Sequence, residues 1–147
     1  MLNVYNWYYL ANYLHRNKIQ LLPKIISYLI RFIFSAWIPH TASIGIGTVF
    51  GYGGLGVVIH SRAIIGEYCH IDQNVTIGGT SKKFEVPTIG NHVYIGAGAK
   101  VLGPIKIGSN VVIGANAVVV KDVPDGCLVA GVPARILKSG IMMRDYV

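Results

Sequence analysis

Two histidines could remove a proton from a hydroxyl group. His60 directly follows an aliphatic residue, at a position where equivalent segments of the chain carry glycine. His70 comes later in the chain, with Glu67 and Asp72 near enough in sequence to orient an imidazole. An imidazole titrates near neutral pH and is the side chain most often used as a general base. We therefore expect His60 to be a catalytic base, with His70 as the alternative.

A six-residue repeat places these histidines in the chain. Ten aliphatic residues share one phase, glycine often follows them, and small or β-branched residues recur four positions later. A helix cannot keep this phase, because six residues turn the side-chain direction by about 600° and the apolar stripe leaves its face. Short strands joined by turns can keep it, so the pattern predicts a parallel β-solenoid with stacked aliphatic residues. The ten positions are Ile59, Ile65, Ile71, Ile77, Ile89, Ile95, Val101, Ile107, Ile113 and Val119.

The repeat also supplies structural interpretations of the histidines. His60 could be hydrogen-bonded at a corner of the solenoid without any catalytic role. His92 occupies a turn position held by Asn110 and Asn116 in other repeats, so we interpret it as a corner residue. Because His60, His70 and His92 fall at different positions of the repeat, they do not converge, and no metal site is expected.

The repeat is interrupted twice. Three extra residues enter between Phe50 and Ile59, in the glycine-rich segment 51–56, and we expect a bulge there because glycine adopts conformations that other residues avoid. His60 follows this bulge directly. The second interruption runs from Thr80 to Pro87, where the register would place Lys83 inside the apolar core. A buried unpaired charge is unfavourable, so this segment is expected to leave the wall as a loop.

Residues 1–38 differ in composition from the rest of the chain. They are rich in aromatic and aliphatic side chains at helical spacing, which predicts two helices separated at Pro23. We expect these helices to cap the open end of the solenoid. Basic residues also lie beside the aromatic ones, a combination that is typical of helices at an anionic membrane surface. A second interpretation is therefore that residues 1–38 make peripheral contact with such a membrane. These residues are Arg16, Lys18, Lys24 and Arg31.

Length and charge narrow the class of protein. The 147 residues correspond to one domain, and 13 Lys and Arg against 6 Asp and Glu give a net charge of +7, which suits an anionic partner. Cys69 and Cys127 fit no C-x-x-C pattern, so we expect free thiols in a reducing cytoplasm. The most apolar early stretch is shorter than the ~20 residues that span a bilayer. A cytoplasmic location is predicted, with the inner face of the membrane as the alternative.

The repeat region resembles the hexapeptide-repeat acyltransferases. The segments that carry this resemblance are 40–80 and 87–137, and the ending VVVKDVP…AGVPARIL is highly specific for members that use acyl-CoA. They look like the serine acetyltransferase branch and are also similar to O-acetyltransferases of surface-polysaccharide gene clusters. The resemblance implies a mainly β fold, a left-handed parallel β-helix over residues 39–138, with an N-terminal helical cap (1–38) and a C-terminal tail (139–147).

The same resemblance implies acetyl-CoA as the acyl donor, bound in a groove between two chains of a homotrimer. Small residues let the donor approach the wall, and basic side chains face its phosphates. Backbone N–H groups near Gly78 or Gly79 would stabilise the thioester oxyanion. The matching donor-binding positions are Gly79, Ala97, Ala115, Lys121, Arg135 and Lys138.

The acceptor site departs from the serine acetyltransferases that the chain resembles. Those enzymes carry an Asp-His pair in the segment matching 51–53 and a second histidine at the position of Val86. A serine site must neutralise a carboxylate and an ammonium, whereas a sugar site uses hydroxyl partners and an aromatic platform. We therefore predict an acetyl-CoA-dependent O-acetyltransferase acting on a sugar hydroxyl of a surface-polysaccharide precursor, with serine O-acetylation as the alternative and no nucleic-acid partner. The predicted acceptor-binding residues are Tyr52, Glu67 and Asp72.

Overall fold

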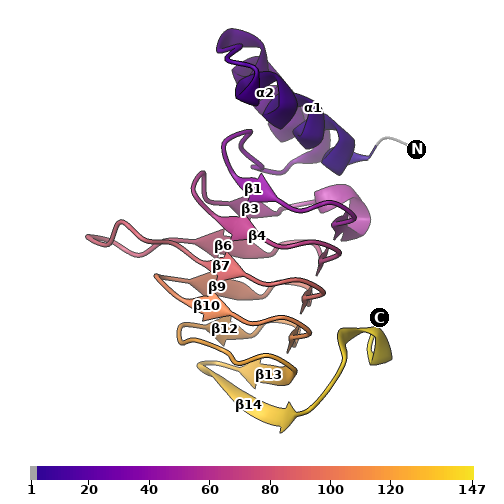
Figure 1. Ribbon diagram of the computed structural model, residues 1–147, viewed down its shortest axis with the longest axis vertical. Helices are drawn as coiled ribbons and strands as arrows, with labels where there is room; N and C mark the ends of the chain where they lie inside the picture. The colour runs from indigo at the N-terminus through magenta and orange to yellow at the C-terminus, as the bar shows by residue number, and fades with distance from the viewer. Residues whose placement is uncertain (1–2) are drawn as a thin grey trace.

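Short parallel strands build a three-sided prism, seen from the side in Figure 1. The computed structural model describes residues 3–147. Each turn of the chain adds one strand to each of three sheets, which we call sheets I, II and III. Sheet I contains β1 (Ser43–Ile44), β4 (Ile64–Ile65), β7 (Thr88–Ile89) and β10 (Lys106–Ile107). Sheet II contains β2 (Val49–Phe50), β5 (His70–Ile71), β8 (Tyr94–Ile95), β11 (Val112–Ile113), β13 (Cys127–Gly131) and β14 (Ala134–Ser139). Sheet III contains β3 (Val58–Ile59), β6 (Thr76–Gly78), β9 (Lys100–Leu102) and β12 (Val118–Val119).

The predicted six-residue phase forms the core of the prism. Each of the ten aliphatic residues in this phase is at most 3% exposed. Within each sheet they stack in register from one coil to the next. In sheet III, for example, Ile59 pairs with Ile77 and Ile77 with Val101. Burying one such side chain contributes about 1.5–3 kcal/mol, so the stacks form a continuous and strongly stabilising apolar core. The predicted parallel β-helix is confirmed.

Glycine follows the aliphatic residues because adjacent coils approach closely at the corners of the prism. A Cβ atom at Gly90 would lie 2.8 Å from the carbonyl carbon of Gly108 in the next coil, and one at Gly96 would lie 2.9 Å from the carbonyl oxygen of Ile113. Side-chain carbons do not come this near to backbone atoms without displacing them. A side chain is therefore admitted at this position only where the next coil leaves room.

Two helices, α1 (Val4–Arg16) and α2 (Leu21–Phe34), cover one end of the prism, as predicted (Figure 1). The buried Tyr8 hydroxyl donates to the Ala42 carbonyl at 2.7 Å and accepts from the Ile44 N–H at 3.0 Å, which fixes α1 to the first coil. The expected break at Pro23 is wrong, because α2 already begins at Leu21. Proline is tolerated in the first turn of a helix, where its missing N–H has no intrahelical partner to lose.

Both interruptions of the repeat appear in the structure. The extra residues of the first form the turn η1 (Gly51–Gly54), in which Tyr52 and Gly53 have φ angles of 49° and 68°. Gly54 is buried, and a Cβ there would lie 3.2 Å from Cγ1 of Val4, so the inner side of this bulge packs under α1. The second interruption leaves the wall between β6 and β7 as a projecting loop, as predicted (Figure 1).

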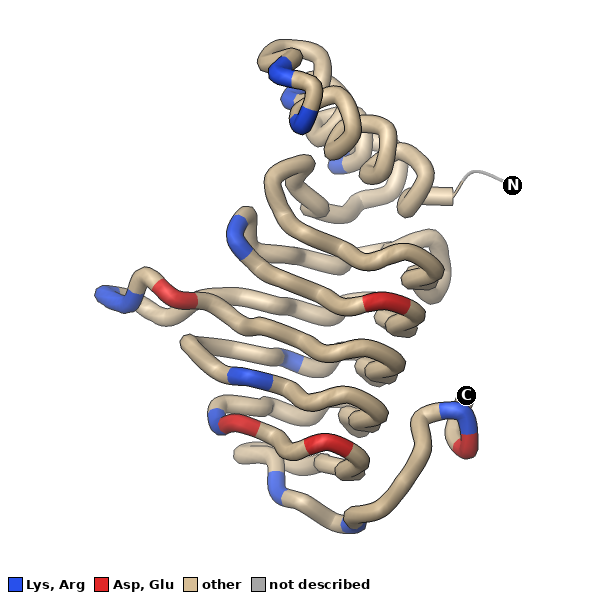
Figure 2. Tube along the Cα trace, in the orientation of Figure 1, with Lys and Arg blue, Asp and Glu red and all other residues tan. Residues whose placement is uncertain are grey.

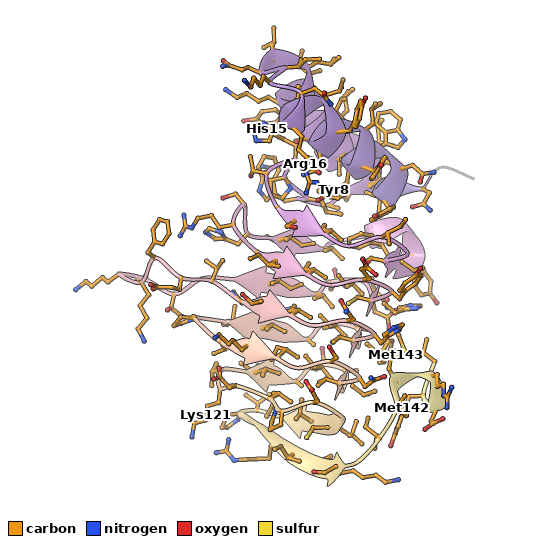
Figure 3. All side chains as sticks on the ribbon, in the orientation of Figure 1. Tyr8, His15, Arg16, Lys121, Met142 and Met143 are labelled. Carbon is orange, nitrogen blue, oxygen red and sulfur yellow. The ribbon has the colours of Figure 1, made fainter. Side chains whose placement is uncertain are left out.

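The other end of the prism is closed by the C-terminal strands. The strand β14 turns back antiparallel to β13, and the chain then runs along the side of the prism to η2 (Met143–Asp145). Ile141 is 6% exposed, and Figure 3 shows Met142 and Met143 on this returning segment. Within residues 3–147, no helix has the length and apolar character to cross a membrane.

Candidate functional site

His60 lies at the end of β3, at the corner where the chain passes from sheet III to sheet I, which we call the III–I corner. Its backbone pairs with the next coil, because its N–H donates to the Ile77 carbonyl at 2.8 Å. A Cβ at Gly79 would be 3.8 Å from Cδ2 and 4.0 Å from Nε2 of His60, so the imidazole lies over this glycine. The Gly78-Gly79 pair therefore makes room for a histidine where other coils require glycine.

The hydrogen bonds of His60 determine which ring nitrogen carries its proton. The backbone N–H of Arg62 donates to Nδ1 of His60 at 3.1 Å. An N–H group can only donate, so Nδ1 is an acceptor and the neutral ring carries its hydrogen on Nε2. Burial, and secondly the charge of Arg62, lower the pKa of His60 below its ordinary value. Near neutral pH the ring is therefore uncharged, with an N–H on Nε2.

The loop of the second interruption is held beside His60 by Arg62. The guanidinium of Arg62 lies 4.1 Å from the ring centroid of Phe84 and donates a hydrogen bond to the Phe84 carbonyl. Val86 is also close, because a Cβ at Gly79 would be 3.2 Å from its Cγ1 atom. The loop of residues 80–87 therefore lies beside the His60 side chain.

An open groove runs past His60 on the outer face of sheet III. Its volume is about 350 Å³, and it is lined by Trp37, Val58, Ile59, His60, Ser61, Ile77 and Gly78. A second groove of about 590 Å³ continues from it towards α2 and shares Trp37 and Val58. The combined surface is apolar along the wall and polar at His60 and Ser61, which suits an extended ligand with one reactive group at the histidine.

His70, at the start of β5 on sheet II, belongs to a second polar cluster. Its Nε2 atom is 3.1 Å from Oδ1 of Asp72, and the Tyr94 hydroxyl donates to the other oxygen of that carboxylate at 2.7 Å. This hydrogen bond is the main reason that the pKa of Tyr94 is raised to about 12, followed by burial. A carboxylate can only accept, so Nε2 of His70 carries the hydrogen and the Nδ1 lone pair of the neutral ring is available.

Within one chain, the structure does not bring the two predicted catalytic histidines together. The III–I corner that carries His60 lies across the apolar core from sheet II, which carries His70. Buried Ile59 and Ile71 lie between these two sides of the prism. One acceptor molecule bound to a single chain cannot contact both rings.

The predicted acceptor-binding residues are also divided. Tyr52 and Asp72 share the corner between sheets II and III, and Tyr52 is 82% exposed. Glu67 lies at the corner between sheets I and II, so within one chain it does not join the other two. Successive turns of the chain visit the three corners of the prism in order. Glu67 lies in the turn that precedes the one carrying Asp72, and therefore at a different corner. Of the two acidic residues considered for orienting an imidazole, Asp72 is the one bonded to His70.

Four of the six predicted donor-binding positions flank sheet III, and the six do not form one cluster. Gly79 and Lys121 follow strands of this sheet at the III–I corner, and Figure 3 shows Lys121 on the same side of the prism as the projecting loop. Ala97 and Ala115 precede its strands on successive coils. The remaining two positions, Arg135 and Lys138, are exposed on β14 beyond the last coil.

The other histidines have structural partners. His92 adopts a φ of 53° at a corner and stacks on Tyr68 at a centroid distance of 5.4 Å, as its turn position predicted. His40 lies 3.0 Å from the Ser27 hydroxyl and packs against His15 under the helices. No group of three metal-ligating side chains occurs within the described residues 3–147.

Sequence reasoning missed three residues of these sites. Tyr94 is bonded to Asp72, and the register in which His70 pairs with Tyr94 could have located it. Trp37 lines the His60 groove because it forms an isolated bridge with Val58, although it precedes the repeat. The contact of Arg62 with Phe84 depends on the conformation of the loop, for which the hexad pattern carries no signal.

Known proteins resemble this chain in sequence. The family model "Bacterial transferase hexapeptide (six repeats)" matches residues 87–121. A serine acetyltransferase of Synechococcus elongatus is 45% identical over 134 residues, which cover 89% of this chain and 54% of that protein. A serine acetyltransferase of Helicobacter pylori is 43% identical over 132 residues, covering 88% of this chain and 77% of that protein. The chain spans about half the length of the Synechococcus relative and of a Synechocystis one, 54% and 47%.

Solved structures show the same architecture. Serine acetyltransferase from Brucella abortus superposes with a TM-score of 0.90 at 34% identity, over 95% of this chain and 57% of that chain. The same enzyme in complex with coenzyme A superposes with a TM-score of 0.88 at 34% identity, over 93% and 55% of the two chains. Because the Helicobacter relative is matched over most of its length, we conclude that the chain belongs to the hexapeptide transferase family, and the relatives described above are named serine acetyltransferases.

Proposed function

We propose that this protein is an acetyl-CoA-dependent O-acetyltransferase and that acetyl transfer takes place beside His60. The observation that carries the proposal is the position of the His60 ring, over Gly79 and at the end of an open groove along sheet III. Relatives named serine acetyltransferase, one of them solved with coenzyme A, support the reaction class and the donor.

The reaction needs a proton acceptor and a hydrogen-bond donor. The acceptor oxygen attacks the thioester carbon, a C–O bond forms, the C–S bond breaks, the hydroxyl proton goes to a base and the CoA sulfur leaves as a thiolate that takes up a proton. The Nε2–H of His60 can donate to the oxyanion that develops on the carbonyl oxygen. The same proton prevents Nε2 from accepting another, so in this ring form His60 does not fit the role of base that the sequence suggested.

His70 fits the role of base better. Its N–H is oriented by Asp72, and its other nitrogen keeps a lone pair, which is the arrangement of an oriented general base. Since His60 and His70 lie on opposite sides of one chain, they can act on one substrate only if the site forms between two chains. The homotrimer implied by the family resemblance would provide such sites, and we propose that His70 is supplied by a neighbouring chain.

The comparisons favour L-serine as the acceptor, because the curated relatives described above are named serine acetyltransferases. One observation keeps a sugar hydroxyl as a second acceptor. The II–III corner presents Tyr52, 82% exposed, beside a glycine, at the segment where the resembled serine enzymes carry an Asp-His pair. An exposed aromatic side chain suits a sugar ring, whereas it cannot neutralise the ammonium and carboxylate of serine.

We further propose that residues 39–138 carry the transferase site, between the helical cap of residues 1–38 and the tail of residues 139–147. Calorimetric titration with coenzyme A tests the donor assignment. We expect saturable binding that weakens when Lys121→Ala or Lys138→Ala removes a positive charge facing the phosphates. Lys106→Ala, on sheet I, is the matched control. Absence of saturable binding by the wild-type protein would refute the donor assignment.

A further inference from the structure

The helix α2 has a second apolar face that the other described residues (3–147) of one chain leave uncovered. One side of the helix, including Ile26 and Ile30, is buried against the rest of the cap. The opposite side presents seven large apolar residues to solvent, and Phe32 is 83% exposed. We call these residues the α2 strip. The α2 strip consists of Leu21, Leu22, Ile25, Tyr28, Leu29, Phe32 and Ile33.

The strip is continuous on the helix surface. Successive residues of an α-helix are separated by about 100° in direction, which places these seven side chains within a sector of roughly 140°. Exposed apolar patches of this kind on soluble proteins mark surfaces that meet another apolar phase. The α1 helix adds exposed Tyr9, Leu10 and Tyr13, so the apolar surface of the cap is not confined to one helix.

The charges around this surface have only one sign. The first acidic residue of the sequence is Glu67, so residues 1–38 contain no carboxylate side chain. Figure 2 shows basic residues and no acidic ones in the helical cap. Lys24 and Arg31 border the α2 strip on the same helix, and Arg16 and Lys18 lie at the end of α1. The partner of this surface must therefore combine an apolar interior with negative charge.

We propose that the α2 strip docks on the surface of an anionic lipid bilayer, with α2 lying in the plane of the membrane. The 14 residues of α2 extend about 21 Å, which is too short to cross the hydrocarbon layer of about 30 Å but suits an interfacial helix. The apolar side chains enter the acyl boundary while the basic ones meet lipid phosphates. A second copy of the cap fits less well, because pairing two caps brings positive charges together with no carboxylate side chain from residues 1–38 to neutralise them.

Co-sedimentation of the full chain with vesicles tests this proposal without using enzymatic activity. We expect binding to vesicles of phosphatidylcholine with about 30% phosphatidylglycerol, little binding to phosphatidylcholine alone, and weakening of the binding by salt. The variants Phe32→Ser and Lys24→Glu should each weaken binding at least ~10-fold. The matched controls Leu137→Ser, 65% exposed at the other end of the prism, and Lys106→Glu should bind like the wild type.

Three results would overturn the proposal. The first is a wild-type protein that stays in the supernatant with anionic vesicles. The second is binding that Phe32→Ser and Lys24→Glu leave unchanged, because the α2 strip would then not be the contact. The third is a smaller oligomer of the free protein in Phe32→Ser than in the wild type by light scattering, since the strip would then be an interface between copies. Circular dichroism of each variant confirms that the helices remain folded.

Discussion

The backbone N–H of Arg62 occupies the Nδ1 lone pair of His60 at 3.1 Å, while the carboxylate of Asp72 holds the Nε2–H of His70 at 3.1 Å. The two imidazoles therefore have different free nitrogens. His60 offers a proton at Nε2, and His70 offers a lone pair at Nδ1. This difference assigns them complementary tasks in an acyl transfer, donor to an oxyanion and acceptor of a hydroxyl proton.

Replacing His60 distinguishes a hydrogen-bond donor from a base. His60→Ala should lower kcat/KM for acetyl transfer about 100-fold, the usual effect of removing one oxyanion donor. His60→Gln should keep activity within about 10-fold of the wild type, because the glutamine amide can place an N–H near the position of Nε2. Steady-state release of free thiol measures both variants.

The control for this pair is His92→Asn, which keeps a residue that tolerates the positive φ of that corner and should retain full activity. If His60→Gln is as inactive as His60→Ala, the side chain at this position must accept a proton, and His60 is the base.

Removing the Asp72 carboxylate should affect both of its partners. Asp72→Asn should shift the ionisation of Tyr94 from a pKa of about 12 towards its ordinary value near 10, because the hydrogen bond to the carboxylate is the main cause of the raised pKa. The same variant should lower kcat, since His70 loses the group that orients it. Ultraviolet titration of tyrosinate follows the first effect and thiol release the second. A lower pKa of Tyr94 with an unchanged kcat would mean that the cluster of His70, Asp72 and Tyr94 has a structural role only.

Mixing two inactive variants tests whether a site forms between chains. His60→Ala and His70→Ala should each be nearly inactive, but co-expressed mixed oligomers should regain a measurable part of the wild-type activity. Recovery is expected because some interfaces then combine an intact His60 from one chain with an intact His70 from the other. Differently tagged chains allow the mixed oligomers to be purified and assayed. Mixed oligomers that stay inactive would contradict a shared site.

The stability of the protein should fall on mild acidification. Burial lowers the pKa of His40 and of His60 in the folded state, so the unfolded chain binds protons more readily than the folded one. Stability is then highest above the ordinary histidine pKa of about 6.5 and decreases as the pH falls below it. Thermal unfolding between about pH 5 and pH 8 measures this effect. His40→Asn, whose amide oxygen can still accept from the Ser27 hydroxyl, should make the Tm depend less steeply on pH. A Tm that rises on acidification would contradict the lowered pKa values of the two histidines.

Two adjacent isoleucines test the register of the solenoid. Ile65 is 2% exposed and points into the core, whereas Ile64 is 49% exposed on the outer face of the same strand. Ile65→Ala should lower the free energy of unfolding by about 2–5 kcal/mol, and Ile64→Ala should change it by less than about 0.5 kcal/mol. Urea denaturation of both variants gives the comparison. Equal losses of unfolding free energy in the two variants would show that Ile65 does not point inward and Ile64 outward as the structure describes.

Much of the fold could be predicted because one repeated pattern specifies it. The six-residue phase identified the ten stacked aliphatic positions from Ile59 to Val119, since only a side chain that recurs once per strand keeps the same orientation in each coil. The charge of Lys83 likewise located the projecting loop. By contrast, a proline can either separate two helices or begin one, so the sequence did not place Pro23 correctly.

The site was less predictable than the core. The position of His60 in a glycine slot was visible in the sequence, but its proton arrangement depends on the Arg62 backbone, which no residue pattern reports. The separation of Glu67 from Tyr52 follows from which corner each turn occupies. Contacts such as Tyr94 with Asp72 join coils that are distant in sequence, and they require the strand register.

Acceptor-dependent release of free thiol from acetyl-CoA tests the central claim most directly. The wild-type protein is assayed with acetyl-CoA alone, with L-serine, and with a hexose or amino-sugar glycoside, each product being identified by mass spectrometry. The account predicts little release without acceptor and a marked increase with one acceptor hydroxyl, with the acetyl group found on that acceptor. Turnover with serine at a kcat/KM of ~10⁴ M⁻¹s⁻¹ or above would establish the acceptor that the relatives indicate. Failure of every acceptor to raise thiol release, in a protein that binds coenzyme A, would contradict acetyl transfer to these hydroxyl groups.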